Sequence, residues 1–224
     1  DLDSAALGKK IDDAYDAAIK AGVDGTPFIL INGAPYRGER SYATFEVILK
    51  LLKLTDRQYI SCPPVKINPA KKYIATIQTT KGDIVLELFP DKAPVAVNSF
   101  IFLAQQGWYN DNPFYGVHPG EYVMTGDPTG TNNGDPGYYY DSEISDLRFD
   151  RAGVVGVNNS GPNVNGGRFF ITLSPQPDLD GGFTIIGQVV EGLNVLSSFP
   201  AFPPEDGQAD TEPVMIRQVT VAEE

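Results

Sequence analysis

Residues 161–173 read GPNVNGGRFFITL, and this stretch decides how the rest of the chain is interpreted. Its first half is built from glycine, proline and asparagine, which favour tight turns and positive-φ conformations. Its second half contains the β-prone run of residues 169–172. Because side chains alternate along a strand, two sets are expected on opposite faces: Arg168, Phe170 and Thr172, and Phe169, Ile171 and Leu173. The stretch therefore predicts a turn followed by a strand that has one apolar face and one face combining a guanidinium with an aromatic ring.

The composition allows a sizeable core and disfavours several classes of function. The chain has 224 residues, of which 42% are hydrophobic, enough for one large or two small domains. The formal net charge of −12 argues against a nucleic-acid partner, since phosphate binding requires clustered lysine and arginine. No apolar run reaches the length of a membrane span, so membrane insertion is not expected.

Cysteine and histidine are too scarce for redox or metal chemistry within these residues. Cys62 is the only cysteine and His118 the only histidine. A lone cysteine forms neither an internal disulfide nor a CxxC pair, and one histidine with one cysteine does not make a zinc ligand set. We therefore expect no metal and no cofactor.

The first 54 residues predict a small α/β segment. A helix with apolar residues at helical spacing is expected to end at Gly22, and a strand over 28–31 precedes the hairpin signal Asn32-Gly33. Ser41 is placed to cap a second helix that runs to about Leu54. Residues 55–70 contain CPP and NP sequences, which oppose regular structure and predict a linker.

The remaining chain predicts a mainly β domain. Residues 72–79 and 84–89 form an expected hairpin, and Pro94 fits the first turn of a helix that Gly107 ends. A second short helix is expected over 192–199. Further β-prone runs, separated by Gly, Pro and Asn, lie near 113–117, 121–125, 153–157, 168–173, 184–190 and 214–221. Many short strands with turn-rich spacers are typical of a barrel.

Five ordered motifs carry a family resemblance. Residues 161–173 are joined by GDIVLELFPDKAPVAVNSF (82–100), PFYGVHPG (113–120), GDPTGTNNGDPG (126–137) and LDGGFTIIGQVVEG (179–192). On these motifs, residues 71–223 resemble the cyclophilins, which are peptidyl-prolyl cis-trans isomerases. The resemblance implies a closed eight-stranded antiparallel barrel with two helices. It also implies proline-containing peptides or unfolded protein chains as partners.

Prolyl isomerisation breaks no covalent bond, so the site needs no nucleophile. The barrier of about 18–20 kcal/mol arises from amide resonance, and the twisted imide nitrogen accepts a hydrogen bond in the transition state. In cyclophilins an arginine is the donor, two residues after a phenylalanine that corresponds to Phe114. This chain has Gly116 there. The resemblance therefore implies an isomerase that lacks its principal catalytic side chain.

Other family positions are retained or replaced. The resemblance implies that the peptide-binding residues are Phe170, Leu179, Tyr122, Phe183, Met124, Asn158 and Asn163. Met124 stands at a glutamine position of the family and Phe183 at a histidine position. Asn163 is alternatively a turn former, because asparagine tolerates left-handed backbone conformations.

Arg168, at a common glutamine position, is the remaining catalytic candidate. It is expected on the face of Phe170, where it either pairs with Glu121 or is solvated, or else reaches the substrate and replaces the missing donor. The first arrangement is expected, since the family arginine approaches from another wall of the pocket. Two functions stay open: an isomerase with reduced activity that assists protein folding, and a non-catalytic or chaperone-like module that binds proline peptides.

Residues 1–54 resemble the closing half of a thioredoxin-fold protein of the disulfide-oxidoreductase type. The carrying features are the Gly25-Thr26-Pro27 strand entry, the Asn32-Gly33 turn and the final helix, whereas the opening unit with its CxxC is missing. The resemblance implies a cis bond before Pro27 and favours an extracytoplasmic, periplasmic or secreted, location. The expected division of the chain is thus a partial thioredoxin-like segment (1–54), a linker (55–70) and a cyclophilin-like domain (71–224), and its oligomeric state is left open.

Overall fold

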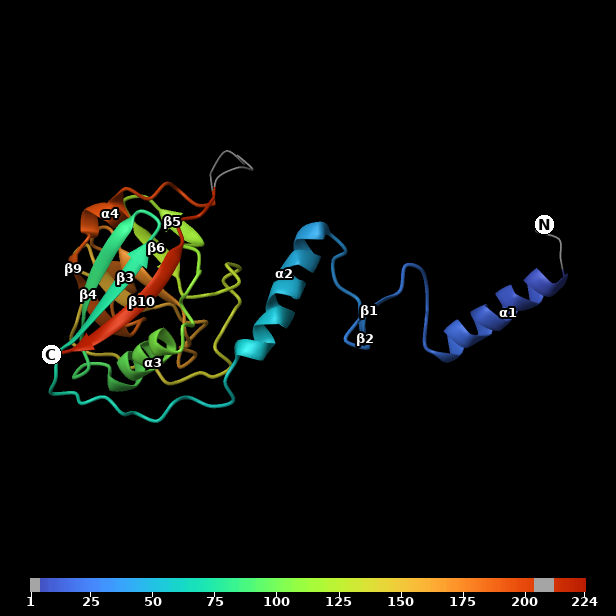
Figure 1. The fold of residues 1–224 in the computed structure, drawn as a ribbon, viewed down its shortest axis with the longest axis horizontal. Coiled ribbons are helices and arrows are strands. Elements are labelled where there is room, and N and C mark those ends of the chain that lie inside the picture. Colours follow the sequence, from blue (N-terminus) through green and yellow to red (C-terminus); the bar gives the residue numbers. More distant parts are fainter. Residues whose placement is uncertain (1–4, 204–211) are drawn as a thin grey trace. The chain divides into compact units, whose positions relative to one another are not determined.

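The computed structural model describes residues 5–203 and 212–224, which form two separate compact units (Figure 1). The first unit ends at Phe45 and the second begins at Glu46. In the described part of the chain, no helix combines the length and the apolar character needed to cross a membrane.

The N-terminal unit has the helix, hairpin and helix start expected from its turn signals. Its elements are α1 (Ala5–Lys20), β1 (Ile29–Ile31), β2 (Ala34–Tyr36) and the start of α2 (Tyr42–Leu54). Gly22 adopts φ 82° after α1, and Asn32 and Gly33 adopt φ 50° and 82° in the turn that joins β1 to β2. The Ser41 hydroxyl accepts a hydrogen bond from the backbone N–H of Thr44 at 3.2 Å. The Thr26–Pro27 bond is cis, as expected.

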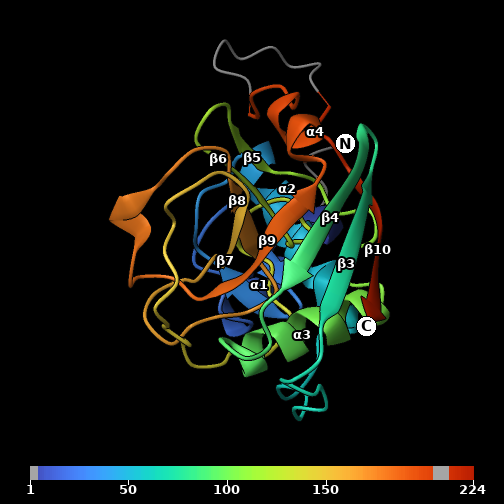
Figure 2. The same cartoon turned by 90° about the vertical axis from the view of Figure 1, so that its left-hand side faces the viewer.

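The second unit is built on one antiparallel sheet of eight strands, which curls around a core (Figure 2). The order across the sheet is β10-β3-β4-β9-β7-β8-β6-β5. The strands are β3 (Tyr73–Thr79), β4 (Gly82–Leu88), β5 (Gly116–His118), β6 (Tyr122–Thr125), β7 (Val154–Val157), β8 (Phe169–Thr172), β9 (Ile185–Glu191) and β10 (Ile216–Glu223). The mainly β class and each expected strand are confirmed, with ends that move by up to about three residues.

The expectation of a closed barrel was wrong, because the outer strands β5 and β10 do not pair. Among the described residues, the segment that precedes β5 bonds to the start of β10. Phe114 N–H donates to Val214 O and Ile216 N–H donates to Asn112 O, both at 2.8 Å, and Asp111 N–H donates to Ile216 O at 2.9 Å. Pro113 lies within this stretch and has no N–H with which to extend the ladder. β5 is also only three residues long. The sheet is therefore an open half-barrel.

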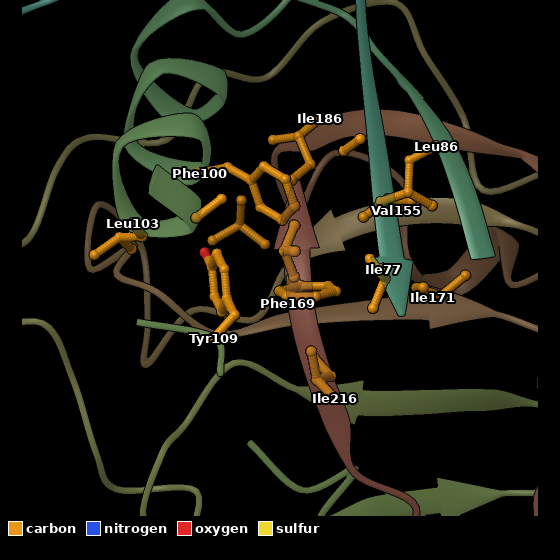
Figure 3. Packing of buried hydrophobic residues seen from close by; sticks show 14 of the residues in the cluster. Ile77, Leu86, Phe100, Leu103, Tyr109, Val155, Phe169, Ile171, Ile186 and Ile216 are labelled. Atoms are coloured by element: carbon orange, nitrogen blue, oxygen red, sulfur yellow. The ribbon is translucent and has the colours of Figure 1, made fainter. Parts of the chain in front are cut away.

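Two helices of this unit lie at opposite ends of the curled sheet, α3 (Pro94–Gln105) and α4 (Leu193–Ser197) (Figures 1 and 2). α3 begins with Pro94, whose missing N–H costs nothing in a first turn. Phe100 of α3 packs edge-on against Phe169 of β8 with ring centroids 5.5 Å apart. Figure 3 shows these rings inside the main core, together with Tyr109 and the aliphatic side chains of several strands.

A second, smaller core lies on the other face of β8. Phe169 and Ile171 belong to the main core, whereas Phe170 packs with Phe149, Val154 and Ile185. This division confirms the alternation expected from the sequence of the strand. A strand buried on both faces explains why the whole of Phe169–Thr172 is shielded from solvent.

The segment between α2 and β3 packs along α3. Lys66 N–H donates to Asn98 Oδ1 at 2.9 Å, and Asn98 Nδ2 donates to the carbonyl of Pro64 at 3.2 Å. The Tyr59 ring meets Phe102 edge-on at 4.9 Å, and Tyr59 N–H donates to Pro136 O at 2.8 Å. Residues 58–67 are therefore held at the surface of the second unit by polar and aromatic contacts.

Candidate functional site

An apolar pocket opens above the smaller core. It has a volume of about 140 Å³ and is lined by Tyr122, Met124, Asn158, Phe170, Leu179 and Phe183. These are six of the seven residues that the sequence assigned to peptide binding. A larger groove of about 370 Å³ between residues 63–67 and α3 shares none of these side chains.

Three aromatic rings around Phe170 shape the pocket. Phe170 stacks on Phe149 at 5.4 Å, and Phe183 meets it edge-on at 5.3 Å with an interplanar angle of 82°. Tyr122 lies 6.4 Å from Phe170 at 70°. Aromatic pairs favour these stacked and edge-to-face arrangements. The pocket therefore has rigid apolar walls on the scale of one small aliphatic ring.

Strand register brings these residues together. Phe170 of β8 lies opposite Met124 of β6 on one side and Gly156 of β7 on the other. A Cβ atom at Gly156 would lie 2.5 Å from Phe170 Cζ, so glycine makes room for the ring. Leu179 arrives on the 3-10 helix Pro177–Leu179. The Asp180 carboxylate that follows accepts a hydrogen bond from Phe149 N–H at 2.8 Å, which ties this helix to the smaller core.

Gly116, where the family arginine is expected, is the register partner of Met124. A Cβ atom at Gly116 would lie 2.4 Å from Met124 Cε and 3.3 Å from Met124 Cβ. The thioether side chain therefore occupies the space into which a side chain at 116 would begin to grow. Gly116 and Met124 are therefore packed so that glycine at 116 leaves room for the methionine side chain.

Arg168 is buried beside the pocket, with 8% of its surface exposed. Its Nη1 donates to Asn132 Oδ1 at 2.9 Å and also to the Asn132 carbonyl, and its Nη2 donates to Ser160 Oγ. The expected ion pair with Glu121, or alternatively solvation, was wrong. Glu121 is exposed and lines a different hollow with His118 and Pro119. Burial favours neutral oxygen acceptors that take the place of water around the guanidinium.

Asn132 connects Arg168 with the pocket. Its Oδ1 also accepts hydrogen bonds from Tyr115 Oη at 3.1 Å and from Asn158 Nδ2 at 3.2 Å. Asn158 Nδ2 further contacts Tyr115 Oη at 3.3 Å and Met124 Sδ at 3.8 Å. Burial raises the pKa of Tyr115 to about 12, against a smaller opposing effect of the hydrogen bond from Asn158, so the hydroxyl stays protonated at neutral pH.

A buried carboxylate builds the loop that carries Asn132. Asp127 is fully buried and accepts backbone hydrogen bonds from Thr129, Thr131, Asn133 and Gly134, at 2.7 to 3.2 Å. Asn132 lies between two of these donors and adopts φ 62°, which asparagine tolerates better than most residues. The loop backbone is thus fixed on both sides of Asn132.

Asn163, the seventh expected binding residue, does not line the pocket. It adopts φ 63°, its Oδ1 accepts a hydrogen bond from Ser142 N–H at 3.0 Å, and its own N–H donates to Ser142 Oγ at 3.2 Å. These bonds are those of a turn former. Sequence reasoning missed Tyr115, Asn132 and Ser160; the only local signal was the TNNG turn sequence, which predicts a loop but not its distant partners.

Comparisons with known proteins agree with the fold. Residues 74–221 match the family model described as cyclophilin type peptidyl-prolyl cis-trans isomerase/CLD. The chain belongs to the cyclophilin-type peptidyl-prolyl cis-trans isomerase family, an enzyme class that acts on proline-containing peptides.

Among its relatives, peptidyl-prolyl cis-trans isomerase-like 1 of Emericella nidulans is 39% identical over 152 residues, covering 66% of this chain and 94% of the relative. Peptidyl-prolyl cis-trans isomerase ppi1 of Schizosaccharomyces pombe is 40% identical over 144 residues, covering 62% and 93%. The crystal structure of the cyclophilin type isomerase cgd2_1660 of Cryptosporidium parvum superposes with a TM-score of 0.62 at 31% identity, covering 68% of this chain and 98% of that one. A second structure of it was determined in the presence of the dipeptide Ala-Pro (TM-score 0.60, 33% identity, covering 66% and 98%).

Proposed function

We propose that the pocket formed by Phe170, Leu179, Tyr122, Phe183 and Met124 receives the proline ring of Xaa-Pro segments in peptides and unfolded chains. The observation that carries this proposal is the size and apolar lining of the pocket, about 140 Å³ with four aromatic or aliphatic walls around Phe170. An apolar wall holds the ring while the imide bond rotates, and it excludes water that would stabilise the planar amide.

We propose further that turnover is reduced, because Gly116 supplies no donor to the imide nitrogen. A single preorganised donor contributes roughly 100- to 1000-fold in rate. Arg168 is the basic residue nearest in sequence to the pocket floor. For it to replace the missing donor, Nη1 or Nη2 would have to leave Asn132 or Ser160, and a lower kcat in Arg168→Met would support this alternative to a purely structural role.

A protease-coupled isomerisation assay on an Xaa-Pro peptide tests this function. We expect measurable catalysis, weaker by roughly 100- to 1000-fold than that of a cyclophilin with the arginine donor, together with peptide binding detected by calorimetry. Binding without catalysis would favour the alternative, a non-catalytic proline-peptide module, which the Gly116–Met124 packing also supports. A chain that neither binds nor isomerises would contradict both.

For the remainder of the chain, we propose a partial thioredoxin-like segment (1–54), a connecting segment (55–70) that packs on α3 through residues such as Tyr59 and Lys66, and the isomerase domain (71–224). The order of helix, hairpin and helix in residues 5–54 supports the first part of this division. By the same resemblance we propose an extracytoplasmic location, which fractionation of cells that produce the full-length protein would test. Cys62 has no second cysteine to exchange with, and burial raises the pKa of its thiol, so no disulfide-exchange activity is proposed.

A further inference from the structure

In the polar network behind the pocket, Arg168 decides which atoms donate and which accept hydrogen bonds. Arg168 carries N–H donors and no acceptor. The side-chain atom of Asn132 that faces Nη1 at 2.9 Å must therefore be the carbonyl oxygen and not the amide nitrogen. The Asn132 carbonyl and Ser160 Oγ accept the other guanidinium bonds, which leaves the guanidinium firmly placed.

The orientation of Asn132 fixes the orientation of Asn158. The Asn158 atom that lies 3.2 Å from Asn132 Oδ1 must be a donor, hence Nδ2. The Met124 sulfur, a weak acceptor, lies 3.8 Å from the same atom and favours the same assignment. The buried Tyr115 hydroxyl donates to Asn132 and accepts from Asn158, so it closes the network with consistent polarity.

This orientation leaves one acceptor free at the pocket. Asn158 lines the pocket and is half-buried. Its Oδ1 accepts no hydrogen bond within residues 5–203 and 212–224, and it is not among the buried unpaired polar atoms of the structure. Covalent geometry places Oδ1 on the side of the amide carbon away from the network. This accessible carbonyl oxygen belongs to a residue that lines the apolar pocket, and Asn132, Tyr115 and Met124 hold the amide group in place through Nδ2.

Resting on the proposed function, we infer that Asn158 Oδ1 accepts a hydrogen bond from a backbone N–H of the bound peptide, and that Arg168 is the positioning residue that orients Asn158 through Asn132. Proline has no N–H, so the donor belongs to a residue that flanks the proline. The contact selects Xaa-Pro segments whose flanking amide is unsubstituted. Because this amide does not react, the bond is equally strong in the ground state and the transition state, and it lowers KM without changing kcat.

The experiment uses the full chain and a series of Ala-Ala-Pro-Ala peptides, each N-methylated at one flanking alanine. N-methylation at one position should weaken binding to the parent by about threefold to tenfold, the effect of one neutral hydrogen bond. The same methyl group should have no such effect in Asn158→Ala or in Arg168→Met. Arg168→Lys keeps a residue that can only donate and should retain part of the discrimination.

Kinetics separate positioning from catalysis. Arg168→Met should raise KM for the unmethylated peptide by about the same factor and leave kcat unchanged, and the Arg168→Met/Asn158→Ala double variant should lose no more than either single variant. The side-chain amide protons of Asn158 should also exchange faster with solvent in Arg168→Met. Arg217→Met, the same replacement at an exposed position of β10, is the matched control and should behave as the parent.

Two results overturn the inference while the proposed function stands: equal N-methyl effects in the parent and in Asn158→Ala, or a lower kcat at unchanged KM in Arg168→Met, which would make Arg168 a donor to the reacting amide. A parent that binds none of the peptides overturns the proposed function and the inference with it. Thermal unfolding of each variant identifies any replacement that prevents folding, and in that case Arg168→Lys and Asn158→Ala decide the outcome.

Discussion

Gly116 and Met124 fill one space between them, and this limits how the missing donor can be restored. Because Met124 Cε lies 2.4 Å from the position of a Cβ at 116, Gly116→Arg alone must first displace the thioether. Met124 Cβ and Cγ, at 3.3 and 3.6 Å, also crowd this position, so we expect Gly116→Arg to raise kcat/KM only slightly even if the terminal methyl group moves aside. Gly116→Arg with Met124→Ala, which removes Cγ, Sδ and Cε, should raise it by about ten- to a hundredfold. Met124→Ala alone is the control for changes in the pocket. Equal gains in the single and the double variant would show that Met124 is no obstacle.

Gly156 gives the second prediction at this scale. A Cβ there would lie 2.5 Å from Phe170 Cζ and 3.0 Å from Phe149 Cε1, and neither ring can flex away as a methionine can. Gly156→Ala should lower the free energy of unfolding by about 1–3 kcal/mol and weaken peptide binding, measured by urea denaturation and calorimetry. Gly182→Ala, where the nearest atom is 3.5 Å away, should change neither. An unchanged Gly156→Ala variant would mean that Phe170 has room to move.

Individual residues also mark the limit of what the sequence predicts. Turn residues such as Gly22 and Ser41, and the alternation at Phe169 and Phe170, follow from local rules, so these elements were predicted closely. The pocket residues were predicted because they lie in motifs of recognisable order. The partners of Arg168 were not: Asn132 lies 36 residues away in the chain, and a buried guanidinium is satisfied by whichever oxygens the fold brings to it. Local periodicity in the sequence does not predict such long-range contacts.

Among the elements, α3 begins without a capping side chain of its own. Ala93 occupies the N-cap position, and the Glu143 carboxylate accepts hydrogen bonds from Val95 N–H at 3.0 Å and Ala96 N–H at 2.8 Å. A carboxylate at this end of a helix satisfies free donors and complements the helix dipole. Glu143 N–H in turn donates to the buried Thr184 hydroxyl at 2.9 Å. A distant segment therefore performs the capping that usually falls to a neighbour.

Glu143→Ala should lower the free energy of unfolding by about 1–2 kcal/mol, because two N–H groups of the first turn lose their acceptor. The measurement is urea denaturation followed by circular dichroism. Glu212→Ala removes an exposed carboxylate outside any helix or strand and is the control for net charge. If both variants unfold at the same urea concentration, the contact with Glu143 contributes nothing to stability.

Closure of the sheet into a barrel is the part of the fold that was wrongly predicted from the sequence. The family resemblance implied closure, and the alternating strands are compatible with it. The gap depends on Pro113 and on a β5 of three residues, features that a motif match does not weigh. The segments that join the two edges contribute isolated bonds in place of a continuous ladder.

At the scale of the whole unit, buried tyrosines make stability sensitive to alkali. Burial raises the pKa of Tyr109, Tyr138 and Tyr140 above the value of about 10 that a tyrosine has in an unfolded chain. Burial raises the pKa of Tyr115 to about 12. The folded state therefore holds protons that the unfolded state releases. Their contribution is complete below about pH 10 and is lost as the pH rises through the folded-state pKa values.

The free energy of unfolding should therefore fall above about pH 10, by up to about 1.4 kcal/mol per pH unit for each tyrosine. Urea denaturation at a series of pH values measures this fall. Tyr140→Phe should reduce this pH dependence by at most the contribution of one tyrosine. The variant also loses the hydrogen bond from Tyr140 Oη to the carbonyl of Gly166. Tyr42→Phe is the control, because that ring is 85% exposed. A flat pH profile between 9.5 and 11.5 would contradict the burial of these hydroxyls.

Because residues 58–67 pack on α3, the start of the folded unit differs from the start of the family match. The family match begins at residue 74, whereas the compact unit begins at Glu46. Residue 74 is where the sequence similarity to the family begins, and Glu46 is where the contacts that hold the folded unit begin. A chain cut at residue 71 would leave the Phe102 ring without Tyr59 and the Asn98 amide without the carbonyl of Pro64.

We therefore expect a 71–224 fragment to be less stable than a 46–224 fragment by about 2–5 kcal/mol, because the cut removes the apolar contacts of Leu54 and Tyr59 and the hydrogen bonds that tie Asn98 to the preceding segment. Equal urea midpoints would instead support residues 55–70 as a passive linker. With the expected result, residues 46–70 belong to the folding unit although they lie outside the residues that the family model matches, and they are the first place to look when an excised domain precipitates.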